Sequence, residues 1–247
     1  MKNKIRKFIL NKLGYWFYKT KHLPVGTDLF VDLKFKVAQP INVVFDVGAN
    51  IGAVSSDFTT EFPNVKVYSF EPIESTFDLL KRNLAHLKNI KTFQIAFGEQ
   101  QEKIEIELNP ESYSPQNSLL NKANNTSEKT EVIDVRTIDV FVKENGIDII
   151  DFLKIDTEGY EEKVLRGAEK TISSGKIKMI YLEVGFSYKN KNNSNFLSLY
   201  KTLEEFGYSF FGLYEISQVG FSSNLHYGNV LFIHSSVISK IESWQLK

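Results

Sequence analysis

The sequence predicts an α/β fold built on a parallel sheet. Apolar runs of strand length alternate with helix-like segments along most of the chain, beginning with residues 43–47, 65–71 and 90–97. The second run follows the glycine turn after the first at the separation of about 20 residues expected of one βαβ unit. Strand, helix, strand, helix and strand in this order, joined by right-handed crossovers, form half of a doubly wound sheet.

Two helices are expected between these strands. Residues 53–62 can form the first helix, which Pro63 and Asn64 end before the next strand. Residues 74–87 carry apolar side chains at helical spacing among polar ones, which predicts an amphipathic helix. These apolar side chains are Phe77, Leu80, Leu84 and Leu87.

An added pair of strands is expected beside the central sheet. Residues 103–108 alternate apolar with charged side chains, which is typical of a half-exposed strand, and residues 131–135 are expected to pair with them. The intervening residues 109–130 are rich in Asn, Ser, Thr and Lys and are too long for an ordinary connection. They form either a substrate loop or a solvated loop without a role.

Helices and strands alternate again after this pair. Helices are expected over residues 138–145, 160–174 and 195–206, and strands over residues 149–155 and 178–184. The last two strands, residues 208–214 and 228–233, are joined by a loop too short for a parallel crossover. They are therefore expected to be antiparallel neighbours.

Composition limits the class of protein. The 247 residues include 30 basic and 30 acidic residues and no cysteine. The balanced charge gives nucleic-acid binding little support, and the lack of cysteine excludes disulfides, thiolate metal ligands and cysteine nucleophiles. No run approaches the roughly 20 apolar residues of a membrane span, and the basic start lacks the apolar core of a signal peptide. We expect a main domain over residues 41–235, located in the cytoplasm.

An N-terminal extension is expected over residues 1–40 and a C-terminal tail over residues 236–247. No acidic residue precedes Asp28, whereas seven basic side chains lie within residues 1–21. Apolar side chains are spaced for one face of a basic amphipathic helix: Ile5, Phe8, Ile9, Leu13, Trp16 and Phe17. Such a helix can lie on an anionic membrane or an acidic partner, or it can pack on its own domain or a second subunit.

The first predicted strand runs into a glycine turn, Val43-Val44-Phe45-Asp46-Val47-Gly48-Ala49-Asn50-Ile51-Gly52. Glycine allows positive φ angles and lets a ligand approach backbone N–H groups. The Asp46 carboxylate would repel a pyrophosphate and attract a sulfonium group, which favours S-adenosylmethionine. The second strand ends at Glu71, whose carboxylate can accept hydrogen bonds from both hydroxyls of a ribose. Taken singly, each acid could also be an ordinary strand-end residue.

A second group of acids is expected at the same edge of the sheet. Asp156 ends the fourth strand and Glu183 the fifth, and adjacent strands lie only about 5 Å apart. Their carboxylates could form a general base and acceptor-positioning pair, which we favour, or ligate a divalent metal such as Mg²⁺. Glu158 is a third catalytic candidate, or else a cap of the next helix. His226, expected in a loop, is a candidate base because histidine titrates near neutral pH, or is inert.

Together these motifs resemble the FkbM family of S-adenosylmethionine-dependent methyltransferases over residues 41–233. The resemblance rests on the glycine turn, on Phe70-Glu71-Pro72, and on Asp151-Phe152-Leu153-Lys154-Ile155-Asp156-Thr157-Glu158-Gly159-Tyr160-Glu161 with Val164-Leu165-Arg166-Gly167-Ala168 after it. It implies the Rossmann-like class I methyltransferase fold, a three-layer α/β/α structure whose seven-stranded, mostly parallel sheet has an antiparallel last strand. It also implies methylation of a hydroxyl on a sugar, glycan or secondary metabolite.

The resemblance further implies where two ligands would lie. It places the adenine of the donor at Ala96 and Phe97, with the Phe97 ring available for stacking. Asn117, Ser118 and Asn229 fall near family-like positions on the acceptor side.

Two other functions stay open. An NAD-dependent dehydrogenase would also use a glycine turn and Glu71, although Gly48 and Gly52 do not supply the Gly-x-Gly-x-x-Gly spacing. The fold could instead serve as a non-catalytic docking module that works through its basic N-terminus. Calorimetry with S-adenosylmethionine and with NAD separates the first two functions, and turnover separates an enzyme from a docking module.

Overall fold

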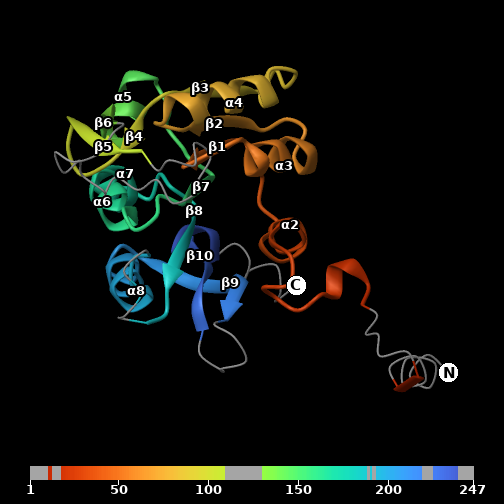
Figure 1. Ribbon diagram of the computed structural model, residues 1–247. Coiled ribbons are helices and arrows are strands. Elements are labelled where there is room, and N and C mark those ends of the chain that lie inside the picture. Colours follow the sequence, from red (N-terminus) through yellow and green to blue (C-terminus); the bar gives the residue numbers. More distant parts are fainter. Residues whose placement is uncertain are drawn as a thin grey trace.

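A seven-stranded sheet forms the centre of the structure (Figure 1). The computed structural model describes residues 11–12, 18–108, 130–187, 190, 193–218 and 225–238. The strands of the sheet lie in the order β3-β2-β1-β7-β8-β10-β9. Their bounds are β1 Val43–Val47, β2 Lys66–Phe70, β3 Ile90–Phe93, β7 Phe152–Ile155, β8 Met179–Gly185, β9 Tyr208–Gln218 and β10 Leu225–His234.

The strand directions confirm the predicted fold. Strand β1 is parallel to β2 and β7, β2 is parallel to β3, and β7 is parallel to β8. The last strand, β10, lies between β8 and β9 and is antiparallel to both. The strand order reverses between β1 and β7, and open sheets of this kind bind ligands beyond the carboxyl ends of the strands at such a point.

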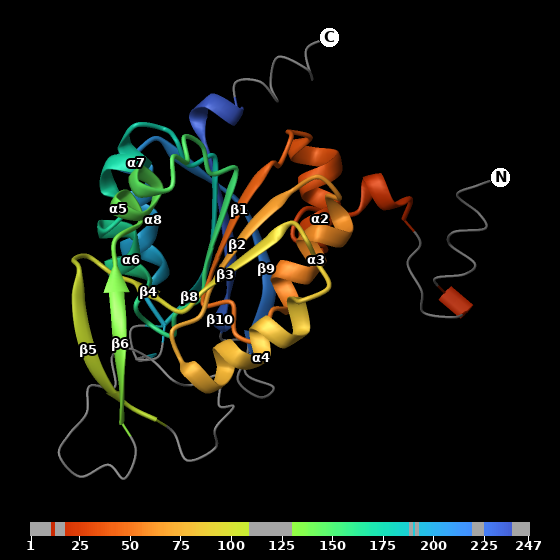
Figure 2. The same ribbon diagram turned by 90° about the horizontal axis from the view of Figure 1, so that it is seen from above.

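Helices cover both faces of the sheet (Figure 2). One face carries α2 Leu29–Asp32, α3 Ala53–Glu61 and α4 Glu74–Leu84, and the other carries α5 Ile138–Glu144, α6 Glu161–Arg166, α7 Glu169–Ser173 and α8 Phe196–Glu205. Two short helices, η1 Thr20–His22 and η2 Leu33–Val37, precede β1. The prediction of a single helix over residues 160–174 is wrong, because α6 ends at Arg166, with Gly167 as its C-cap, and α7 begins at Glu169. The carbonyl of Gly167 accepts a hydrogen bond from the N–H of Asp139 at 3.0 Å.

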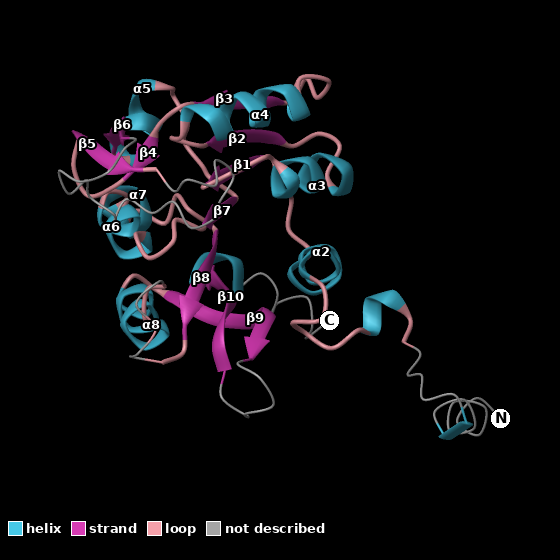
Figure 3. Ribbon diagram, viewed as in Figure 1, coloured by secondary structure: helices cyan, strands magenta, loops and turns pink. Residues whose placement is uncertain are grey.

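A small second sheet covers one end of the core (Figure 3). It consists of β4 Ala96–Phe97, β5 Glu102–Glu107 and β6 Thr130–Arg136 in the order β4-β6-β5. The expected antiparallel pairing of β5 with β6 is confirmed. The prediction of one strand over residues 90–97 is wrong. Strand β3 stops pairing with β2 after Phe93, and Ala96 and Phe97 pair instead with β6.

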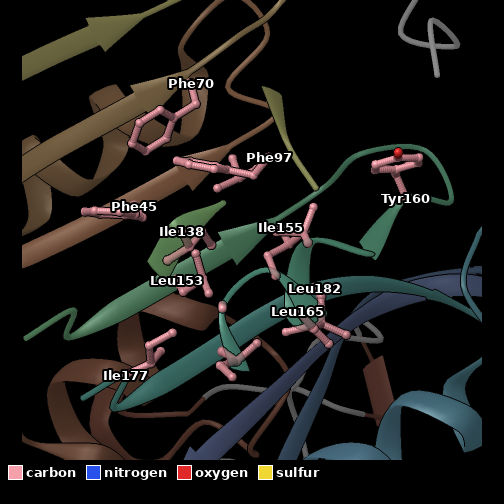
Figure 4. Packing of buried hydrophobic residues seen from close by; sticks show 14 of the residues in the cluster. Phe45, Phe70, Phe97, Ile138, Leu153, Ile155, Tyr160, Leu165, Ile177 and Leu182 are labelled. Atoms are coloured by element: carbon pink, nitrogen blue, oxygen red, sulfur yellow. The ribbon is translucent and has the colours of Figure 1, made fainter. Parts of the chain in front are cut away.

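The core beneath the second sheet is rich in phenylalanine (Figure 4). Phe70 packs against Phe45 and Phe97, with ring centroids 5.1 and 4.6 Å apart, and Phe141 meets all three rings edge-on. Rings that interlock at these angles resist small displacements, since protein cores are packed to crystal density. The middle of β1 and the ends of β2 and β4 are thereby held in fixed positions.

Part of the predicted N-terminal extension belongs to the domain core. Leu33 and Val37 are each 1% exposed and pack with Phe58, Phe152 and other residues on the α3 face of the sheet. Most of the predicted N-terminal amphipathic helix, the greater part of the loop over residues 109–130 and most of the C-terminal tail lie outside the described residues. Within the described part of the chain, none of the helices combines the length and apolar character needed to cross a membrane.

Candidate functional site

The glycine turn after β1 is held by its two neighbouring strands. Gly48 has φ 75° and Asn50 has φ 50°, so both adopt the left-handed conformation. The N–H groups of Gly48 and Ala49 both donate to the carbonyl of Phe70, at 3.0 and 2.9 Å. These two N–H groups are therefore already bonded within the chain, which corrects the expectation that the backbone of this turn faces a ligand with its donors.

We expect a Gly48→Ala substitution to disrupt this turn. A Cβ atom at position 48 would lie 1.8 Å from the carbonyl oxygen of Asp156, and the left-handed conformation alone costs a non-glycine residue about 1–2 kcal/mol. Urea denaturation should show a loss of about 2–3 kcal/mol. Gly146→Ala is the matched control, since its φ is 61° and a Cβ there meets nothing within 4 Å. Equal losses in the two variants would contradict the role of the Asp156 contact.

Gly52 serves helix packing rather than a ligand. A Cβ at this position would lie 2.9 Å from side-chain atoms of Leu80 and Leu84, so the glycine lets the start of α3 approach α4. Gly52 does not line the cavity described below. Its predicted role in cofactor binding is therefore indirect.

Asp46 lies beneath the turn and is fully buried. Its carboxylate accepts a hydrogen bond from Ser55 Oγ at 2.6 Å and forms an ion pair with Lys154 Nζ at 3.3 Å. It lines neither of the two cavities at this edge of the sheet, so the expectation that it meets the sulfonium directly is corrected. The structure instead presents Asp46 as the counter-ion of a buried lysine.

Lys154 connects the glycine turn after β1 with the acids Asp46 and Asp156. Its ammonium donates to the carbonyl of Gly48 at 2.8 Å and lies 3.3 Å from carboxylate oxygens of both Asp46 and Asp156. Burial lowers the pKa of Lys154, but the charges of Asp156 and Asp46 outweigh it and raise the pKa above the ordinary value. The partners of Lys154 could not be predicted from the sequence, because β1 and β7, which pair in the sheet, are separated by about 100 residues of chain.

The first cavity lies at the carboxyl ends of β1, β2 and β7. Apolar side chains such as Phe70, Ile95 and Ile106 form part of its wall. The predicted site residues that line it are Gly48, Asn50, Glu71, Ala96, Phe97, Asp156 and Glu158. A mixed wall of this kind, largely apolar with a few convergent polar groups, is typical of a small-molecule site.

Glu71 is the buried acid of this cavity. It is 7% exposed, and its two carboxylate oxygens accept hydrogen bonds from the N–H groups of Asn50 and Ile73, each at 3.1 Å. Burial raises the pKa of Glu71 to about 7, although both backbone N–H groups and the charge of Lys154 act in the opposite direction. Each oxygen retains acceptor capacity for a ligand hydroxyl, since a carboxylate offers about four lone-pair sites.

Phe97 contributes to the cavity wall from within the core. It is 1% exposed and its ring packs against Phe70 and Phe141, while the neighbouring Ala96 is 5% exposed. The open stacking face implied for Phe97 is therefore largely used in packing.

The charges of three predicted catalytic acids act on one another, although Glu183 lines neither of the two cavities at this edge of the sheet. The charges of Asp156 and of Glu158 both act on Glu183, and that of Asp156 acts on Glu158. Burial first, and then the negative charge of Asp156, raise the pKa of Glu158 to about 7 and that of Glu183 to about 8. Asn193 donates a hydrogen bond to Glu183. Among the described residues, no group of three or more His, Cys, Asp or Glu side chains is arranged to hold a metal ion.

Sequence reasoning missed the structural importance of Glu161. This residue is fully buried at the start of α6. One oxygen accepts hydrogen bonds from Thr157 and Gly159, at 3.0–3.1 Å, and the other accepts from the Ser194 hydroxyl at 2.6 Å. Glu161 therefore fixes the loop that carries Asp156 and Glu158. An acid in the first turn of a predicted helix was the available signal.

A second cavity lies on the α3 side of the sheet. Residues 26–30 form one part of its wall, and the polar side chains elsewhere along it include Lys154, Asp156, Tyr181, Glu215 and Asn229. Asn229 donates to Glu215 at 2.6 Å. Asp156 lines both cavities, and its side chain is 39% exposed, so it stands where the two spaces meet.

The remaining predicted residues are not brought to either cavity by the structure. His226 lies within β10 rather than in a loop, its carbonyl accepts a hydrogen bond from the N–H of Phe186, and it lines neither cavity. The predicted catalytic role of His226 has no geometric support. Asn117 and Ser118 lie outside the described residues.

Comparisons with protein families and with known sequences both find methyltransferases. The model of the methyltransferase FkbM domain matches residues 46–210. The 2-O-methyltransferase NoeI of Sinorhizobium fredii is 24% identical, over 59% of this chain and 64% of the relative. The 31-O-demethyl-FK506 methyltransferase FkbM of Streptomyces tacrolimicus is 30% identical, over 53% and 61%, and the hexuronic acid methyltransferase AglP of Haloferax volcanii is 25% identical, over 67% and 66%. The matches thus span slightly under two thirds of each relative's length.

Solved methyltransferase structures are more distant in sequence. SMU.1697c from Streptococcus mutans, a putative methyltransferase solved in complex with SAH, is 12% identical over 83% of this chain and 98% of that chain, with a TM-score of 0.47. TrmK of M. capricolum, solved with S-adenosyl-homocysteine, is 14% identical over 81% and 66%, with a TM-score of 0.44.

Proposed function

The chain belongs to the FkbM methyltransferase family, and from this premise we propose that it transfers the methyl group of S-adenosylmethionine to a hydroxyl of a sugar, glycan or secondary metabolite. The observation that carries the proposal is the meeting of two cavities at Asp156. Relatives whose names specify O-methylation or a hexuronic acid support a hydroxyl acceptor of this kind.

The residues of the first cavity fit the donor chemically. Glu71 offers a buried carboxylate to the two ribose hydroxyls, and the apolar wall around Ala96 and Phe97 suits an adenine ring. Asn50 and Gly48 border the cavity near Asp156, where the methionine part would lie. We assign Asp46 and Lys154 the role of fixing this turn, through the bond from Lys154 to the Gly48 carbonyl.

The reaction requires the chain to orient the acceptor and to take its proton. S-adenosylmethionine supplies a methyl group already activated by the sulfonium. Asp156 accepts the proton of the acceptor hydroxyl as the new carbon–oxygen bond forms and the carbon–sulfur bond breaks. Glu158 and Glu183 can receive that proton in turn when they are ionised, since pKa values of about 7 and 8 leave part of each group ionised near neutral pH. Positioning within the second cavity supplies the remaining part of the rate.

Two measurements test this function. Calorimetry should show binding of S-adenosylhomocysteine and no binding of NAD; the reverse would favour a dehydrogenase. Incubation with S-adenosylmethionine and a panel of hydroxylated acceptors should release S-adenosylhomocysteine. Donor binding without turnover on any acceptor would favour a docking module. Turnover that EDTA abolishes and Mg²⁺ restores would instead assign Asp156 and Glu183 to a metal.

Donor affinity should rise with pH up to about pH 7. Below about pH 7 the free site holds a proton on Glu71, whose pKa is about 7, whereas accepting bonds from both ribose hydroxyls requires the carboxylate. Binding therefore releases a proton, so affinity increases by up to about tenfold per pH unit below 7 and levels off above it. Calorimetry with 5′-methylthioadenosine measures this without a titrating group on the ligand between about pH 6 and 8.

The matched variant for this prediction is Glu71→Gln. The amide keeps one acceptor oxygen and cannot titrate, so affinity at about pH 8 should fall by about tenfold and its dependence on pH should disappear. Glu131→Gln is the control, since Glu131 also has a raised pKa but lines neither cavity. An unchanged pH profile in Glu71→Gln would remove Glu71 from the ribose site.

A further inference from the structure

We propose, resting on the methyltransferase function above, that the second cavity is the acceptor site and that it selects an acceptor bearing a protonated amine beside its hydroxyls, such as an amino sugar. The same site would reject uronic acids and phosphorylated sugars. The proposal stands on the charges along the cavity wall, on one tyrosine hydroxyl of that wall, and on the position of the cavity relative to the range that the family model matches.

The wall of the second cavity is acidic. Four carboxyl groups line it, from Asp28, Asp57, Asp156 and Glu215. Lys154 is the one cationic side chain among the described residues of this wall, and its ammonium is already shared between two carboxylates and the Gly48 carbonyl. A cleft lined by one sign of charge concentrates ligands of the opposite sign. An anionic acceptor would meet repulsion, whereas an ammonium group would meet at least two carboxylates not neutralised by Lys154.

Tyr181 indicates that the cavity takes a polar ligand. The residue is 5% exposed and lines the cavity, and its hydroxyl has no hydrogen-bond partner among the described residues. Tyr181 shares this wall with Glu215 and Asp156, and burial together with the charges of these two carboxylates raises the pKa of Tyr181. On the cavity wall, this hydroxyl can both donate to and accept from a ligand hydroxyl, and it can accept from an amine.

The two cavities differ in their relation to the family model. The first is lined by residues between Val47 and Glu158, all inside the matched range 46–210. The second takes much of its wall from outside that range, namely from residues 26–30, Tyr214, Glu215 and Asn229. A shared donor and a chain-specific acceptor would produce this division.

The N-terminal part of this wall is fixed to the domain. Asp32, which is fully buried, accepts hydrogen bonds from the Gly26 N–H at 2.8 Å and from the Tyr214 hydroxyl at 2.9 Å. Residues 26–30 and β9 are thereby joined through one carboxylate. The acceptor wall is preorganised, which reduces the entropy that an acceptor must lose on binding.

The charge preference can be tested with three matched glycosides. The full chain, saturated with S-adenosylhomocysteine, is titrated at about pH 6.5 with the methyl glycosides of glucosamine, N-acetylglucosamine and glucuronic acid; the amine is protonated at this pH. We expect the affinity order glucosamine, N-acetylglucosamine, glucuronic acid, with a preference for the amine that weakens at high salt. Equal or tighter binding of the glucuronide, or no binding of any of the three, would overturn the proposal.

Two variants connect this preference to the cavity. Asp57→Asn combined with Glu215→Gln should weaken binding of the glucosamine glycoside by about fivefold and leave binding of the N-acetylglucosamine glycoside nearly unchanged. Tyr181→Phe should weaken binding of both glycosides by about fivefold. Asp148→Asn is the control, since Asp148 lines a different hollow of the surface. Unchanged affinities in both test variants would place the acceptor elsewhere.

The same titrations separate this proposal from the function on which it rests. Binding of S-adenosylhomocysteine should stay within about twofold of wild type in every variant, because none of the altered residues lines the first cavity. If wild type fails to bind S-adenosylhomocysteine, the methyltransferase function fails. If wild type binds it and prefers the glucuronide, only the acceptor proposal fails.

Discussion

Asp156→Asn should lower turnover by about 10²–10⁴-fold and leave donor affinity close to that of wild type. Asparagine has nearly the same shape as aspartate but cannot accept the acceptor's proton. The side chain of Asp156 is 39% exposed at the junction of the two cavities, and Lys154 holds one of its oxygens at 3.3 Å. The change therefore removes the proposed base while the walls of both cavities remain.

The measurement is the rate of S-adenosylhomocysteine formation at saturating donor, with calorimetry of S-adenosylhomocysteine beside it. Glu162→Gln is the control, because Glu162 lies in the neighbouring helix α6 and lines neither cavity. Wild-type turnover in Asp156→Asn, together with loss in Glu183→Gln or Glu158→Gln, would move the base to that residue. Loss of donor binding in Asp156→Asn would instead make Asp156 a donor contact.

The sequence was sufficient for the parts of the fold that are local or periodic. Alternating helices and strands, acids at strand ends and glycines at turns are short-range signals. They predicted the sheet and the position of Glu71 and Asp156 at its carboxyl edge. The split of residues 90–97 between two sheets was not predictable in this way. It depends on pairing with β6, which lies far along the chain, and strand propensity does not specify a partner.

Long-range packing also explains what was missed at the site. The sequence suggested that Asp46 faces a ligand, whereas the pairing of β1 with β7 places Asp46 opposite Lys154. The second cavity requires residues 26–30 to meet β9 and β10, and that contact depends on Asp32, an acid inside a short helix. Such a residue carries no local signal, because its partners are set only by the tertiary fold.

Lys154→Met should reduce the free energy of unfolding by about 3–5 kcal/mol, the range found when one partner of a buried ion pair is removed. Methionine replaces most of the length of the lysine side chain but not its charge. The Asp46 carboxylate would lose its counter-ion. Because Asp46 is completely buried, water could not replace the lysine, and the carboxylate would keep only the hydrogen bond from Ser55. The bond that ties the Gly48 carbonyl to β7 would also be lost.

A double-mutant cycle separates the buried charge from the loss of packing. Asp46→Asn removes the charge left behind, so Lys154→Met combined with Asp46→Asn should be more stable in urea denaturation than Lys154→Met alone. The coupling should favour the pair by more than about 1 kcal/mol, since the two groups lie 3.3 Å apart away from water. Strictly additive losses would mean that Asp46 is stabilised by Ser55 without Lys154, and that Lys154 acts only through Gly48 and Asp156. In that case turnover, rather than stability, would be the property that Lys154 controls.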